Sequence, residues 1–190
     1  AEPYFEGIVE SRYFDTLSLL TLSQCKDGAQ RKAKFRLRRY NNDSLAELQI
    51  KTKDLFPVRK IKSGGARWKP YANWNEASLA AEGESGKLIR QIARTYPPLY
   101  PVIQIRYRRR RYRIGDCRIT LDSEIEAMAC DGLKMRIRST IALRSAVLET
   151  KVPSDTPFIP AFLRDRIRRD SFSKFALLTR QLLGETTNSV

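Results

Sequence analysis

The sequence contains no histidine among its 190 residues. A Ser-His-Asp triad, a histidine general base and a histidine-ligated metal are therefore excluded. A metal ion in this chain has to be held by carboxylate oxygens, which favours Mg²⁺ or Mn²⁺ over Zn²⁺.

Cysteines and long apolar runs are also scarce. Cys25, Cys117 and Cys130 are scattered without CxxC spacing, so we expect incidental thiols in a reducing compartment, the cytoplasm. No stretch approaches the ~20 consecutive apolar residues of a membrane span. Attachment to the cytosolic face of a membrane would therefore come only through other domains or partners.

Positive charge is what the chain has in excess. Lysine and arginine total 36 against 21 acidic residues, a net charge of +15. Such an excess argues for an anionic partner, which could be nucleic acid, an anionic membrane or a phosphate compound. Tyrosines interleaved with arginines suit a nucleic-acid stacking platform, but no RRM, KH, zinc-finger or helix-turn-helix signature accompanies them. Nucleic acid is thus the less favoured partner.

The hydropathy pattern predicts one α+β domain over residues 1–190, mainly antiparallel. Seven strands are predicted, at residues 4–14, 33–40, 45–53, 102–114, 117–122, 133–139 and 146–152. Helical spacing covers residues 76–95, with breaks expected at Gly83 and Gly86, and returns at 159–169 and 173–183. The basic segment 59–74 is expected to form loops, and a turn is expected at residues 24–30.

The polar faces of the predicted strands are rich in cations. Lys34, Arg36 and Arg38 alternate along one strand, and Arg109 and Arg111 along another. Solvated sheet faces are the ordinary explanation, yet like charges on adjacent strands repel one another unless an anion neutralises them. A sheet closed into a barrel with these charges inside would form a polar tunnel, with helices covering its apolar outer face.

Several blocks in these strands look familiar in their order along the chain. They are SRYFDT (11–16), KFRLRRY (34–40), LQIKTK (48–53), PVIQIRYRRRRY (101–112), RITLD (118–122), VLETK (147–151) and FSKF (172–175). Together they resemble the polyphosphate polymerase domain of the vacuolar transporter chaperone (VTC) family, within the triphosphate tunnel metalloenzymes.

The resemblance implies an antiparallel eight-stranded β-barrel with flanking helices. It implies transfer of the γ-phosphoryl group of ATP onto a polyphosphate chain with Mn²⁺ or Mg²⁺. The implied phosphate ligands are Lys34, Arg36, Arg38, Lys51, Arg109, Arg118, Lys151 and Lys174. Of these, Arg36, Arg38, Arg109, Arg118 and Lys174 would also be catalytic. Glu149 would hold the metal, unless it forms an internal salt bridge instead.

The sequence departs from the family pattern in three ways. No Glu/Lys-rich strand precedes Tyr4, and a count of seven strands agrees with a missing first strand. Gln49 stands where the family often has glutamate, so metal binding or catalysis is expected to be weaker. The run Arg108–Arg111 is more basic than the pattern, and extra arginines would strengthen polyanion binding. A non-catalytic polyphosphate-binding module and a tunnel triphosphatase therefore remain alternatives.

Overall fold

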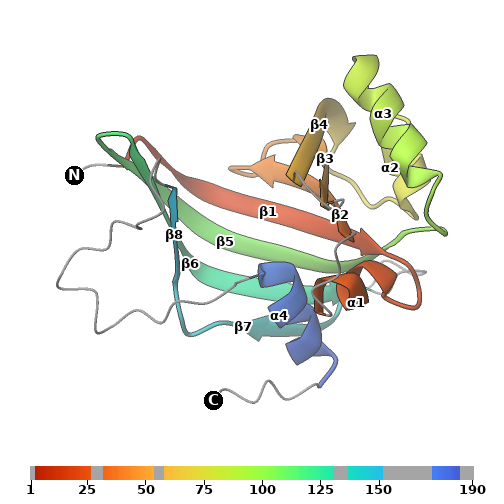
Figure 1. The fold of residues 1–190 in the computed structure, drawn as a ribbon. Coiled ribbons are helices and arrows are strands. Elements are labelled where there is room, and N and C mark those ends of the chain that lie inside the picture. Colours follow the sequence, from red (N-terminus) through yellow and green to blue (C-terminus); the bar gives the residue numbers. More distant parts are fainter. Residues whose placement is uncertain (1–2, 27–31, 54–57, 131–136, 152–172, 185–190) are drawn as a thin grey trace.

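A computed structural model describes residues 3–26, 32–53, 58–130, 137–151 and 173–184. Eight antiparallel strands form one sheet in the order β4-β3-β2-β1-β5-β6-β7, with β8 also paired to β6 (Figure 1). The strands are β1 (Phe5–Asp15), β2 (Lys32–Tyr40), β3 (Leu45–Lys53), β4 (Val58–Arg67), β5 (Tyr100–Ile114), β6 (Cys117–Cys130), β7 (Ile137–Ala142) and β8 (Val147–Lys151). The helices are α1 (Leu20–Lys26), α2 (Trp74–Ser78), α3 (Gly83–Ala93) and α4 (Lys174–Leu182). The predicted α+β antiparallel class is confirmed.

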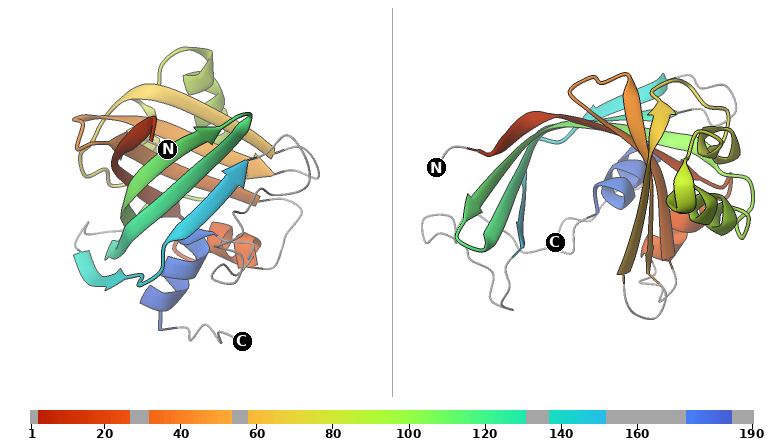
Figure 2. Two further views of the ribbon diagram at one scale, coloured as in Figure 1. Left: turned by 90° about the vertical axis from the view of Figure 1, so that its left-hand side faces the viewer. Right: turned by 90° about the horizontal axis from the view of Figure 1, so that it is seen from above.

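The sheet is an open arch, and the predicted closure into a barrel is not observed in the described residues. β4 forms one edge, and β7 and β8 lie at the other, with no ladder between the two edges across the described strands. Seen from above, the sheet curves over α4, while α2 and α3 lie outside the curve (Figure 2). We call the side toward α4 the inner face and the opposite side the outer face.

The eighth strand is β4, in the segment predicted to form loops. It pairs with β3 from Lys53↔Val58 to Leu45↔Arg67, with an irregularity between Ala46 and Leu48. Gly65 lies there with φ of +89°, and this break in the ladder obscures the alternation in the sequence. The prediction of loops was wrong, and the strand count no longer supports a missing first strand.

Strand β6 continues well beyond the predicted end at residue 122. A bulge shifts the β5–β6 register between Arg106↔Glu126 and Arg108↔Ser123, and Glu124 adopts φ of +52°. The extra residue reverses the alternation, so that Asp122 and Ile125 both face inward although they are three residues apart. A strict period of two therefore ends the predicted strand too early.

The helices follow most of the sequence signals, but Gly86 lies inside α3 and does not break it. The predicted break at Gly83 separates α2 from α3, and the helix predicted at 173–183 is α4, capped by Ser173 and followed by Gly184 at φ of +75°. Helix α1 was missed, because part of it was taken as a turn. Asp15 caps it by accepting the backbone N–H groups of Thr21 and Leu22. The helix predicted at 159–169 lies outside the described residues.

Apolar clusters lie on both faces of the sheet. On the outer face, α2 and α3 cover β2 and β3, as the sequence predicts. Phe35 of β2 and Leu48 of β3 lie in one buried cluster with Trp74 of α2. On the inner face, α1 and α4 pack against β1 and β5, and Phe175 of α4 stacks on Tyr13 with ring centroids 4.8 Å apart. Helices thus lie on both sides of the sheet, and α4 occupies part of the inner face, the side on which the resemblance places Lys174.

Candidate anion-binding face

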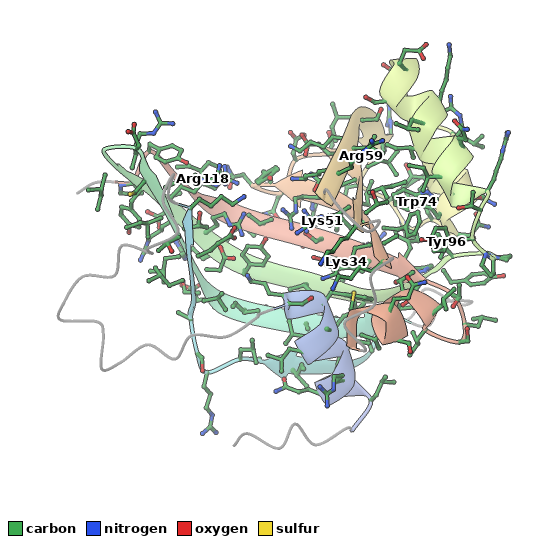
Figure 3. The ribbon with its side chains drawn as sticks, in the orientation of Figure 1. Lys34, Lys51, Arg59, Trp74, Tyr96 and Arg118 are labelled. Carbon is green, nitrogen blue, oxygen red and sulfur yellow. The ribbon has the colours of Figure 1, made fainter. Side chains whose placement is uncertain are left out.

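Lysines and arginines of β2, β3 and β4 form rows across the inner face. Lys34 lies opposite Lys51, which lies opposite Lys60. Directly opposed residues of antiparallel strands project to the same side, so these side chains converge, and Figure 3 shows Lys34 and Lys51 there. The adjacent row runs from Arg36 through Gln49 to Lys62.

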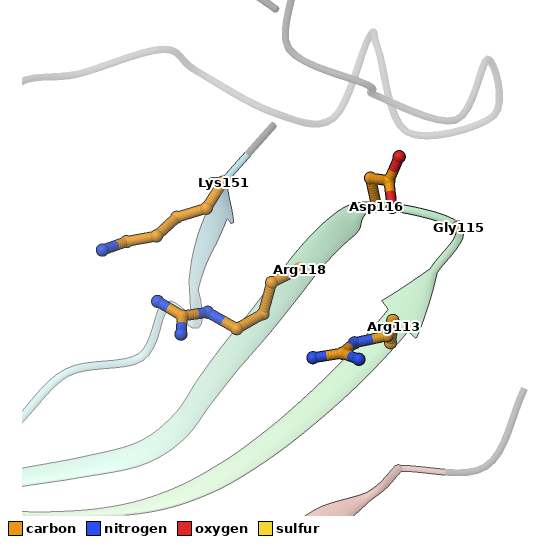
Figure 4. A pocket seen from close by; sticks show the side chains of 5 residues that line it. All are labelled: Arg113, Gly115, Asp116, Arg118 and Lys151. Carbon is orange, nitrogen blue, oxygen red and sulfur yellow. The ribbon is translucent and has the colours of Figure 1, made fainter. Parts of the chain in front are cut away.

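A second group of cations lies where β5, β6 and β8 meet. Arg113 pairs with Arg118, and Arg118 with Lys151. These three side chains, with Gly115 and Asp116 of the turn, line a hollow of about 380 Å³ (Figure 4). Two of the sequence-predicted phosphate ligands, Arg118 and Lys151, therefore share one concavity.

Neutral groups hold the guanidinium groups of Arg36 and Arg38. Arg36 donates from Nε and Nη2 to Gln49 Oε1, at 2.9 and 2.7 Å, and from Nη1 to the hydroxyl of Tyr13 at 3.1 Å. Arg38, which is 6% exposed, donates to Ser11 Oγ at 2.8 Å and to the hydroxyl of Tyr107 at 3.2 Å. No carboxylate in the described ranges lies within ion-pair distance of either arginine, so both retain their full positive charge.

Arginines on the outer face of β5 have carboxylate partners instead. Arg108 donates to Glu124 at 2.9 Å, Arg110 donates to Glu6 at 3.0 Å, and Arg106 lies 3.8 Å from Glu126. The basic run 108–111 therefore alternates between the faces, and only Arg109 and Arg111 project inward. Carboxylates compensate the outer arginines, and of the two inner ones Arg109 is paired with Asp122 while Arg111 lies over the ring of Phe5.

The positive potential of the inner face shifts the pKa of its titratable groups. Burial lowers the pKa of Lys51, as do the charges of Lys34 and Arg36. Burial and neighbouring cations, Arg36 first among them, lower the pKa of Lys60 to about 8. Burial alone would raise the pKa of Tyr13, but the nearby arginines outweigh it and bring the value to about 8. Crowded cations of this kind favour the binding of an anion.

One buried carboxylate ties three elements together beside these cations. Asp122 of β6, 1% exposed, accepts both N–H groups of the Arg109 fork at 2.6 and 2.7 Å, and Lys174 Nζ of α4 lies 2.6 Å from its Oδ2. Burial would raise the pKa of Asp122, but these two cations hold it below its usual value. Arg109 and Lys174 thus meet at the inner face, with part of their charge already neutralised.

The described inner face offers few ligands for a metal. Glu149 is exposed and lies 3.8 Å from Lys151 Nζ, so its ion pair is with a lysine rather than an arginine. Across the described ranges no three acidic or cysteine side chains come together as a metal site. Mg²⁺ and Mn²⁺ often bind through one or two carboxylates plus phosphate oxygens and water. Glu149 therefore fits a metal that arrives with a phosphate ligand, and does not fit an all-protein cage.

The structure places the predicted site residues in three neighbouring groups. Lys34, Arg36, Arg38 and Lys51 lie on β2 and β3, Arg118, Glu149 and Lys151 on β6 and β8, and Arg109 and Lys174 beside Asp122. The sequence prediction did not assign Tyr13, Lys60, Lys62 or Arg113 to this face, and it placed Arg111 beside Arg109 without making it a phosphate ligand. The i, i+2 spacing of Lys60 and Lys62 repeats that of Lys51 and Lys53, and it was the available signal for β4.

An antiparallel sheet with a cationic, largely uncompensated inner face defines a class of domain suited to a polyanionic ligand. The family model described as VTC domain matches residues 3–183. The chain belongs to the VTC domain family, which relates it to polyphosphate, and the resemblance found in the sequence is confirmed. No curated protein matches the chain.

Among the described helices, none has the length and apolar character needed to cross a membrane.

Proposed function

We propose that this domain binds polyphosphate along its inner face and extends the chain by transferring the γ-phosphoryl group of ATP onto it. The observation that carries the proposal is the unequal pairing of arginines on the two faces. Arg108 and Arg110 outside are bound by carboxylates, whereas among the described residues the partners of Arg36 and Arg38 inside are neutral. A row of free charges in a curved sheet suits an extended phosphate chain better than a single compact anion.

Each group of residues has a distinct part in the proposed reaction. Arg36 and Arg38 neutralise charge on the phosphates, and their neutral partners keep the two forks fixed before the ligand arrives. Lys34 and Lys51 extend this patch along the sheet, while Arg118 and Lys151 bind phosphates at the β5–β6 turn. Arg109 and Lys174 serve as phosphate ligands whose positions are set by Asp122.

The divalent metal is assigned to Glu149. Glu149 would hold Mn²⁺ or Mg²⁺, and the bound metal would supply charge neutralisation during phosphoryl transfer. The chain's own contribution is the exposed carboxylate of Glu149, which lies beside Lys151 in the row next to that of Arg118 and Lys151.

A polyphosphate-binding module without turnover is the second candidate. It is favoured by the metal site, which in the described part of the chain amounts to one exposed carboxylate. Phosphoryl transfer depends on metal ions as well as on arginines. A face that binds chains through arginine alone would hold polyphosphate without extending it.

We expect the purified protein to make long polyphosphate from ATP and Mn²⁺, more readily with a short primer, as resolved on a gel. Glu149→Gln is expected to lower the rate at least tenfold, because it removes the carboxylate that positions the metal. Glu126→Gln is the matched control, since Glu126 is also half-exposed and paired to a cation but lies on the outer face. Its rate should stay within about twofold of the wild type.

The three candidate functions give different products. Phosphate release without longer chains would select a triphosphatase. Tight polyphosphate binding with no product of either kind would select the binding module. Equal rates in Glu149→Gln and the wild type would remove Glu149 from the metal site.

A further inference from the structure

Gln49 lies at the centre of the arginine patch and is 1% exposed. Its Oε1 accepts two hydrogen bonds from Arg36, at 2.9 and 2.7 Å, and its Nε2 donates to Glu47 Oε2 at 2.5 Å. Glu47 also lies 3.4 Å from Lys62 Nζ. One amide thus connects a carboxylate on its own strand to an arginine on the neighbouring strand.

Only a side chain that both accepts and donates satisfies these two neighbours. A guanidinium group is a donor alone and an ionised carboxylate is an acceptor alone, so the orientation of the Gln49 amide is fixed by Arg36 on one side and Glu47 on the other. A carboxylate at position 49 would keep the contact with Arg36 but would put two acceptor oxygens against each other at Glu47.

The amide also leaves the charge of Arg36 intact. Its two hydrogen bonds fix the fork, as a carboxylate would, but they supply no negative charge. Glu47 does not compensate Arg36 either, because its contacts are with Gln49 and Lys62. Arg36 is therefore held in place and partly exposed on the inner face, and no carboxylate among the described residues pairs with it.

We propose that Gln49 is a positioning residue that makes phosphate binding at the Arg36 row independent of a divalent metal. A glutamate at this position would offset the charge of Arg36 and place a second carboxylate beside Glu47, and a divalent cation would neutralise that pair. With Gln49 the row binds metal-free polyphosphate directly. The proposal rests on the proposed function, since it takes polyphosphate as the ligand, and it concerns binding rather than turnover.

The test compares Gln49→Glu with the wild type in polyphosphate binding, once with a metal chelator and once with Mn²⁺, over a series of salt concentrations. In chelator, Gln49→Glu should bind about tenfold more weakly, because one inner-face charge is cancelled. The slope of log affinity against log salt should fall by about one, as expected when one cation–phosphate contact is lost. Mn²⁺ should restore most of the affinity of the variant and change that of the wild type little.

Two further variants separate charge from structure. Gln104→Glu is the matched control, because Gln104 accepts a hydrogen bond from Arg12 Nη2 at 2.9 Å across β1 and β5 on the outer face. It adds the same charge and should change neither the affinity in chelator by more than about twofold nor its response to Mn²⁺. Gln49→Met removes the hydrogen bonds without adding charge, and should weaken binding with the salt slope unchanged. Thermal unfolding curves check that all three variants fold.

The outcomes distinguish the two proposals. Gln49→Glu that binds as the wild type does in chelator, or that loses the same affinity with and without Mn²⁺, overturns the role of Gln49 while leaving polyphosphate binding in place. A wild-type protein that binds no polyphosphate under either condition overturns the proposed function itself, and the role of Gln49 with it.

Discussion

Replacing Arg38 by glutamine is expected to weaken polyphosphate binding about 10- to 100-fold. The guanidinium of Arg38 is almost fully buried in the inner face, and its partners are the hydroxyls of Ser11 and Tyr107. A phosphate that reaches it forms a charge-assisted hydrogen bond in a region shielded from water, where such bonds are strongest. Titration calorimetry or fluorescence anisotropy with a labelled chain measures the loss.

Arg110→Gln is the control for this prediction. It removes the same charge from the outer face of β5, where Arg110 is bound by Glu6 at 3.0 Å. Its affinity for polyphosphate should stay within about twofold of the wild type, because an exposed, compensated charge contributes little at physiological salt. Equal losses in the two variants would mean that the chain responds to net charge alone and has no defined binding face.

Replacing Asp122 by alanine is expected to lower the free energy of unfolding by about 3–5 kcal/mol, the cost of removing one partner of a buried ion pair. Arg109 and Lys174 would be left beside each other, 12% and 16% exposed, without their common carboxylate. Helix α4 would also lose one of its polar contacts with the sheet. Urea denaturation of the two proteins measures the difference.

The pH dependence of stability is a second test of the contribution of Asp122. The pKa of Asp122 is held below its usual value in the folded protein, so the carboxylate stabilises the fold above the pKa of an unfolded aspartate, about 4. That contribution is lost as the pH falls from there through the folded pKa. The wild type should therefore lose stability in acid more steeply than Asp122→Ala.

Added polyphosphate and a control variant distinguish the buried ion pairs of Asp122 from an ordinary surface ion pair. Polyphosphate should stabilise Asp122→Ala more than the wild type, because phosphate oxygens replace the missing carboxylate next to Arg109 and Lys174. Glu126→Ala removes the half-exposed partner of Arg106 and should cost less than about 1 kcal/mol. An Asp122→Ala variant as stable as Glu126→Ala would contradict the structural role given to Asp122.

The sequence was sufficient to predict most strands because polar and apolar residues alternate strictly along them. Lys34, Arg36 and Arg38 share a face in the structure as their spacing predicts, and so do Arg109, Arg111 and Arg113. The alternation failed wherever a bulge intervened. It ended β6 at residue 122, two residues before the positive φ of Glu124, and it missed β4, where Gly65 interrupts the ladder.

The sequence alone could not predict which side chains pair across neighbouring strands. The spacing of Arg106–Arg113 shows that alternate arginines face opposite sides, but not that Glu6, Glu124 and Glu126 compensate one side only. The register also had to be known before Gln49 could be placed between Glu47 and Arg36. The seven-strand count was wrong for the same reason, since a strand with few apolar residues is recognised mainly by its partner.

Lysine labelling with and without polyphosphate tests the inner face as the binding surface most directly. Lys51, Lys60 and Lys151 are exposed on this face, whereas Lys69 and Lys87 are 53% and 70% exposed and are paired with Glu76 and Glu84 away from the inner-face rows. Lys60, with its pKa lowered to about 8, has a large fraction of neutral amine near neutral pH and is expected to be acetylated readily. Mass spectrometry should show that polyphosphate protects Lys51, Lys60 and Lys151 from acetylation and leaves Lys69 and Lys87 unchanged. Uniform protection of all five lysines, or protection of Lys69 and Lys87 alone, would contradict the account.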